Sequence, residues 1–201
     1  MPWSGVQVPP RLPPEKANAM IVHLNGLPGV GKYTTAKILV GLLPKARLID
    51  NHALINAAYV CGGEHGSPEY MALLEKLVDL VYTELEKRPS DEIMVFTNAL
   101  AADCPIDGPR FDRVVALAKA RNDMFVPVRL TCTIEENVRR GITPERAQKQ
   151  KLIKPDILQA LAEKHTVLHP SDHPYQLDID TTALQAEDVA QQIAEHIQKN
   201  L

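Results

Sequence analysis

The fold is decided by residues 20–38, MIVHLNGLPGVGKYTTAKI. Residues 20–24 are mostly apolar, as in a buried strand, and residues 35–39 favour a helix. Between them, residues 26–32 read G-x-x-x-x-G-K, the sequence of a phosphate-binding P-loop. Glycines allow a turn in which several N–H groups point at one oxyanion, and the helix that follows adds the positive end of its dipole. We therefore predict a strand–loop–helix unit that binds a polyphosphate, with the Lys32 ammonium beside the β- and γ-phosphates.

The loop departs from the common P-loop at the residue after the lysine. That position usually carries Ser or Thr, whose hydroxyl ligates Mg²⁺, but here it is Tyr33, followed by Thr34. A phenol on a rigid ring does not place its oxygen where a serine Oγ would lie, so Thr34 is the candidate magnesium ligand. The predicted nucleotide-binding residues of the loop are Gly26, Leu27, Pro28, Gly29, Val30, Gly31, Lys32, Tyr33 and Thr34.

Residues 26–34 match, at every defined position, the G-x-P-G-x-G-K-x-T loop of adenylate kinases. The segment resembles the small P-loop kinases, which include adenylate, shikimate and gluconate kinases and the chloramphenicol phosphotransferases. It is most similar to shikimate-kinase-like ATP-binding proteins, in which Asp-Asn-His follows the second strand, as residues 50–52 do here. The resemblance implies a three-layer α/β/α P-loop kinase fold. It further implies a five-stranded parallel sheet in the order 2-3-1-4-5 and a small helical lid.

Strand patterns recur along the chain with helical patterns between them. They fall at residues 20–25, 46–50, 92–97, 125–132 and 176–180. This alternation predicts an α/β domain over residues 19–201, with a parallel sheet covered on both faces. Pro127, inside the fourth strand, has no backbone N–H to donate to a neighbouring strand. We therefore expect that strand to start at Val128 or to bulge there. Residues 1–18 contain five prolines and are predicted to form a flexible arm.

The end of the second strand carries two candidates for chemistry. Asp50 and His52 fall at the carboxyl end of the predicted sheet, where the P-loop also lies. A carboxylate near a metal, or an imidazole, can take the proton of an attacking hydroxyl. In shikimate kinases a pair of acids at these positions serves the metal shell and the acceptor, so the resemblance implies that Asp50 is catalytic and near Mg²⁺, largely through water, and that His52 contacts substrate. The histidine argues against shikimate itself as acceptor. In the alternative interpretation Asp50 caps the next helix and His52 is a surface residue.

The third strand ends in residues 96–100, FTNAL, without the acid that many P-loop proteins carry there. Asn98 is a candidate contact for substrate or for a metal-bound water, or else it satisfies the turn after the strand.

Residues 139–154 are basic and resemble the lid of a small kinase. Arg139 and Arg140 end one short helix, and Pro144 begins another that carries Arg146. The resemblance implies that such arginines close over the transferring phosphoryl group, with Arg140 catalytic and Arg139 and Arg146 on the nucleotide. The local alternative is that cations are simply favoured at a helix C-terminus.

The leading function is an ATP-dependent, Mg²⁺-requiring kinase acting on a hydroxyl of a small molecule. A nucleic-acid 5′-hydroxyl kinase is a second hypothesis, but a net charge of −3 and 4% aromatic residues argue against that partner. Tyr33 and the missing acid leave open a third, a regulatory nucleotide-binding module without transfer chemistry.

The cysteines are odd in number and widely spaced, and no apolar run is long enough for a membrane span, so we expect a reduced, cytoplasmic protein.

Overall fold

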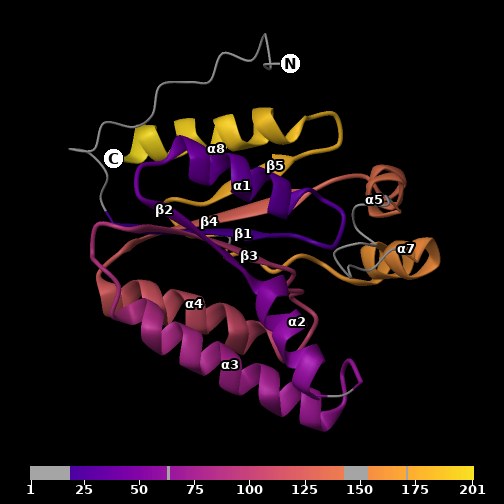
Figure 1. The fold of residues 1–201 in the computed structure, drawn as a ribbon. Coiled ribbons are helices and arrows are strands. Elements are labelled where there is room, and N and C mark those ends of the chain that lie inside the picture. The colour runs from indigo at the N-terminus through magenta and orange to yellow at the C-terminus, as the bar shows by residue number, and fades with distance from the viewer. Residues whose placement is uncertain (1–18, 63, 143–153, 171) are drawn as a thin grey trace, which may run out of the picture.

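The computed structural model describes residues 19–62, 64–142, 154–170 and 172–201. The predicted arm and Arg146 lie outside these residues. The sheet has five parallel strands in the order β2-β3-β1-β4-β5, which confirms the expected order (Figure 1). The strands are β1 (Met20–Asn25), β2 (Ala46–Asp50), β3 (Ile93–Asn98), β4 (Met124–Thr131) and β5 (Leu177–Asp180).

Helices cover both faces of this sheet. In Figure 1, α1 and α8 lie on one face and α3 and α4 on the other, while α2 extends from the end of β2 and packs against α3. The described helices are α1 (Lys32–Leu42), α2 (Asn51–Gly62), α3 (Pro68–Glu86), α4 (Asp107–Arg121), α5 (Ile134–Gly141), α7 (Pro155–Lys164) and α8 (Ala186–Asn200). None of the described helices is both long and apolar enough to cross a membrane.

The central strand β1 is buried along its whole length. Met20, Val22 and Leu24 pack into the core under α1 and α8, whereas Ile21 packs into the core under α3 and α4. Each such side chain contributes about 1.5–3 kcal/mol on leaving water. Burial on both faces explains why the strand is apolar without alternation, as parallel strands between two helical layers are.

The expectation for Pro127 is wrong. Strand β4 starts at Met124 and runs without a break through Pro127, which pairs opposite His23 of β1. Strand β5 joins β4 only from Val128 onward. On the side of β4 away from β1, no strand therefore pairs with Pro127. A missing N–H on that side costs no hydrogen bond between strands.

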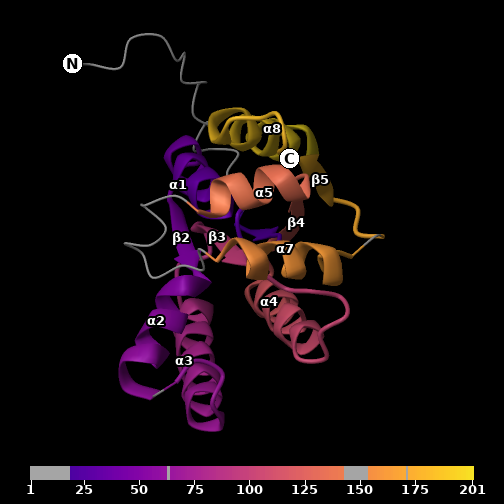
Figure 2. The ribbon, with the colours of Figure 1, turned by 90° about the vertical axis from the view of Figure 1, so that its right-hand side faces the viewer.

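The carboxyl ends of the strands meet at one edge of the sheet, because all five strands are parallel. Figure 2 views the molecule from this edge, with α5 and α7 in front of the sheet. Four segments lie at this edge: the P-loop, the ends of β2 and β3, and the loop between β5 and α8. The edge therefore collects the residues that form the candidate site.

Candidate active site

The P-loop joins β1 to α1, as the sequence predicts. Gly29 and Gly31 have φ angles of 103° and 94°, in the left-handed region that favours glycine. A Cβ on Gly29 would also lie 2.8 Å from the Nδ2 atom of Asn137 on α5. That amide donates to the carbonyl oxygen of Pro28 at 2.6 Å, so α5 holds the loop from outside.

The Lys32 ammonium lies over the loop. Its Nζ donates to the carbonyl oxygens of Gly26 at 2.5 Å and Leu27 at 2.9 Å. The charge is thus placed beside the N-terminus of α1, which begins at Lys32 itself. An anion held by the backbone N–H groups of the loop would meet the ammonium at the same place.

Asp50 is held at the end of β2 by the neighbouring strand. The register of β2 and β3 places Asp50 opposite Thr97, whose Oγ1 donates to Asp50 Oδ1 at 2.6 Å. The same oxygen accepts from the backbone N–H of His52 at 3.4 Å, in the first turn of α2. Asp50 therefore supports the helix start and also faces the cavity described below. The sequence reasoning missed Thr97, although a polar residue one place before the end of β3 was the available signal.

Asn98 is oriented by a buried histidine. His23 Nε2 lies 3.0 Å from Asn98 Oδ1, and since an amide oxygen only accepts, the imidazole donates. Asn98 also lines the cavity, so its amide nitrogen is the side-chain atom that can donate a hydrogen bond to a ligand there. Burial lowers the pKa of His23 to about 4, so its ring is neutral at pH 7.

We expect this histidine to make the fold acid-sensitive. Between pH 6.5 and about 4 the unfolded chain protonates His23 and the folded chain does not, so stability falls as the pH falls through this window. The free energy of unfolding is expected to drop by about 3 kcal/mol from this group. Urea titrations at pH 7, 6, 5 and 4 measure the loss, and His23→Gln should flatten the slope. An unchanged slope in that variant would assign the loss to other groups, such as His169 and His173, whose pKa values burial also lowers.

Asn25, at the end of β1, is a residue that sequence reasoning did not identify. Its Nδ2 donates to the carbonyl oxygens of Leu100 at 3.0 Å and Leu168 at 2.7 Å. Its Oδ1 accepts from the backbone N–H of Gly26 at 2.9 Å and of Leu100 at 2.8 Å. This buried amide therefore ties the start of the P-loop to the loop after β3 and the segment after α7.

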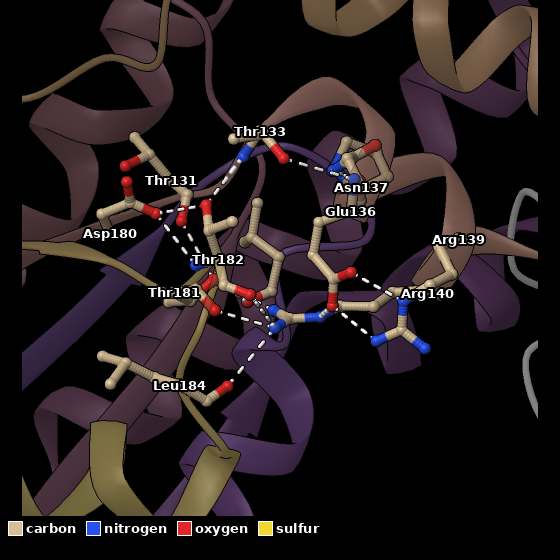
Figure 3. A network of polar contacts seen from close by, with 12 residues as sticks. Thr131, Thr133, Glu136, Asn137, Arg139, Arg140, Asp180, Thr181, Thr182 and Leu184 are labelled. Atoms are coloured by element: carbon tan, nitrogen blue, oxygen red, sulfur yellow. Dashed lines mark hydrogen bonds and ion pairs between the residues drawn. The ribbon is translucent and has the colours of Figure 1, made fainter.

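The two arginines at the end of α5 differ in their surroundings (Figure 3). The Arg140 guanidinium points at the loop after β5 and donates to Thr181 and to backbone carbonyls there. Arg139 is 71% exposed and pairs with Glu136, which also binds Arg140. Hydrogen bonds from Arg139, then Arg140, lower the pKa of Glu136 to about 2. To reach a phosphate, Arg140 would have to leave the loop, whereas Arg139 would leave only Glu136.

One cavity of about 1020 Å³ brings most of the predicted residues together. The P-loop and the first turn of α1 line its middle. Its polar end is formed by residues at the ends of β2 and β3 and on α2. Its other end is formed by the loop after β5 and the start of α8, with the two arginines of α5 beside it. The lining includes Pro28, Gly29, Val30, Gly31, Lys32, Tyr33, Thr34, Asp50, His52, Asn98, Arg139 and Arg140. Gly26 and Leu27 contribute instead through the carbonyls that hold Lys32.

Comparison with solved structures places this arrangement among known folds. A candidate kinase from Chloroflexus aurantiacus is 16% identical, with 92% of this chain and 100% of that chain covered and a TM-score of 0.67. A gluconokinase from Sinorhizobium meliloti is 13% identical, with coverages of 92% and 95% and a TM-score of 0.60. A shikimate kinase from Acinetobacter baumannii, solved with shikimate, is 20% identical, with coverages of 94% and 98% and a TM-score of 0.54.

No protein-family model matches the chain, and no curated protein matches it at the level of sequence. The likeness is therefore one of three-dimensional structure. It extends over most of the chain. The chain has the fold of the small P-loop kinases.

Proposed function

We propose that this protein is an ATP-dependent, Mg²⁺-requiring phosphotransferase that moves the γ-phosphate to a hydroxyl of a small molecule. The observation that carries the proposal is the form of the cavity. The P-loop lies in its middle. One end carries the acid and imidazole side chains of Asp50 and His52 with Ile55 beside them, and the other end carries Leu184 and Val189 with Thr181 and Gln185 beside them. Such a cavity has room for a nucleotide and an acceptor on opposite sides of the transferring group.

At the centre, the loop N–H groups and Lys32 would hold the β- and γ-phosphates and offset the charge that develops during transfer. At the polar end, Asp50, His52 and the Asn98 amide face the same space. The acceptor hydroxyl would lie there, with its proton passing to the Asp50 carboxylate or the His52 imidazole as it attacks. Asn98, with its oxygen engaged by His23, would donate to an oxygen of the acceptor.

The residues present fit a magnesium ion held mostly through water. Asp50 uses one carboxylate oxygen for Thr97 and keeps further lone pairs for a hydrated metal. Thr34 is exposed on the cavity wall, although Tyr33 stands where a direct serine or threonine ligand is usual. Mg²⁺ retains several waters and binds few protein oxygens, so this donor set suits it. When bound, the ion would neutralise charge on the transferring phosphoryl group.

An acceptor-dependent ADP-release screen tests the proposal. Purified protein with Mg-ATP is offered sugars, nucleosides, nucleotides and RNA with 5′-hydroxyl ends. Release that depends on a small alcohol supports the proposal, and a Lys32→Ala sample controls for contaminating activity. Release with RNA ends alone would indicate a nucleic-acid kinase. ATP binding without transfer to any acceptor would indicate a regulatory nucleotide-binding module.

A further inference from the structure

The two ends of the cavity differ in chemistry, and this assigns a place to the nucleoside. With phosphates at the P-loop, as the proposed function requires, the polar end at Asp50 and His52 suits an acceptor. The opposite end is lined by Leu184, Ala186 and Val189 together with Thr181 and Gln185. A flat base with apolar faces is accommodated better by such a wall. Residues 181–184, between β5 and α8, therefore form the wall of the nucleoside end.

This loop is attached to the neighbouring elements by a set of polar contacts. The Thr181 N–H donates to the carbonyl oxygen of Thr131 at 2.8 Å. The Thr182 hydroxyl accepts from the Thr133 N–H at 2.9 Å, just before α5. The Asp180 carboxylate accepts from the Thr182 N–H at 2.9 Å. These contacts fix one side of the loop to β4 and to the start of α5.

Arg140 fixes the other side. One terminal nitrogen donates to Thr181 Oγ1 at 3.1 Å. The other donates to the carbonyl oxygen of Thr181 at 2.7 Å and is shared between those of Thr182 and Leu184, each at 3.3 Å, and Nε donates to Glu136. Several carbonyl oxygens that face one point repel each other unless a cation lies between them. The guanidinium reaches these carbonyls, the Thr181 hydroxyl and the Glu136 carboxylate with three separate nitrogens, which the single nitrogen of a lysine ammonium cannot do.

Figure 3 shows this difference between the neighbouring arginines: the Arg140 side chain reaches into the loop, and Arg139 extends away from it. Only 22% of the Arg140 side chain is exposed, against 71% for Arg139. Both residues border the cavity. Arg140 is thus engaged by Glu136 and by several groups of the loop, whereas Arg139 is engaged by Glu136, so Arg139 is the arginine that can turn toward a bound phosphate without releasing the loop.

We propose that Arg140 is a positioning residue that shapes the nucleoside end of the site through residues 181–184, and that Arg139 is the α5 arginine that contacts the phosphates. This assignment rests on the proposed nucleotide site. It departs from the sequence-based interpretation, in which Arg140 acts on the transferring group.

Two ligands separate the roles, because Mg-ATP has a base and Mg-tripolyphosphate does not. Dissociation constants for both are measured by calorimetry on wild type, Arg140→Ala and Arg139→Ala. Arg140→Ala is expected to weaken ATP binding about tenfold, since a loop fixed on one side only must be ordered on binding, and to change tripolyphosphate binding less than about twofold. Arg139→Ala removes the same charge one residue away and is expected to weaken both ligands by the same factor.

Arg140→Lys guards against a fold defect in the alanine variant. It keeps the positive charge and loses the planar fork, so it should show the same selective loss for ATP. Equal weakening of the two ligands by Arg140→Ala, or unchanged ATP binding, would overturn the assignment. A wild-type protein that binds neither ligand would instead refute the nucleotide site on which the assignment rests.

Discussion

Replacement of Lys32 by alanine is expected to abolish phosphoryl transfer, with kcat reduced at least about 10³-fold, the upper end for loss of one charge-stabilising donor. The ammonium lies on the carbonyl oxygens of Gly26 and Leu27, at the start of α1, where the phosphates would bind. ATP binding should weaken as well, because the same charge attracts the ground-state phosphates. Turnover with the acceptor from the screen and calorimetry with Mg-ATP measure the two effects.

The fold of the Lys32→Ala variant should be intact. Lys32 is not part of the buried core, so the free energy of unfolding should change by less than about 1 kcal/mol. Lys119→Ala, which removes an exposed charge near the end of α4, is a matched control and should behave as wild type. Near-normal ATP affinity and turnover in Lys32→Ala would refute the P-loop assignment.

Asp50→Asn is expected to lower kcat by about 10²–10³-fold while the ATP dissociation constant changes by less than about threefold. An amide keeps an oxygen that accepts from Thr97, so the contact between β2 and β3 survives. It cannot take a proton from the acceptor, and it holds a hydrated magnesium ion less well than a carboxylate. Single-turnover rates at saturating Mg-ATP, compared with calorimetric affinities, separate the two quantities.

Thr97→Val provides the comparison for this prediction, because it removes the contact and leaves the carboxylate. If Asp50 acts in chemistry, the loss of rate in Asp50→Asn should far exceed that in Thr97→Val. Should Asp50→Asn weaken ATP binding and rate by equal factors, Asp50 would be a structural cap of α2 rather than part of the reaction.

The parts of this fold that follow from sequence are those whose causes lie within one short segment. The P-loop conformation depends on Gly29 and Gly31, whose positive φ angles are available to glycine in any context. The starts of α3 and α5 depend on Ser67 and Thr133, each of which accepts from a backbone N–H three residues on. The order of the strands came from resemblance, because no single segment encodes which strands pair.

The tertiary structure decided the features that join distant segments. Pro127 is accepted in β4 only because β5 begins pairing one residue later. Asn25 holds carbonyl groups of residues 75 and 143 positions away, and Thr97 holds an acid 47 positions away.

Arg140 shows most clearly what the sequence determined and what the tertiary structure determined. The sequence by itself placed an arginine pair at the end of a short helix, since periodicity and capping are local, and the resemblance to kinase lids implied that phosphates bind nearby. It did not determine where each guanidinium points, because the acceptors of Arg140 lie 41 to 44 residues further along the chain. Those carbonyls reach the arginine only after β5 pairs with β4 and brings its loop against α5, a contact made by packing rather than by any pattern in the sequence.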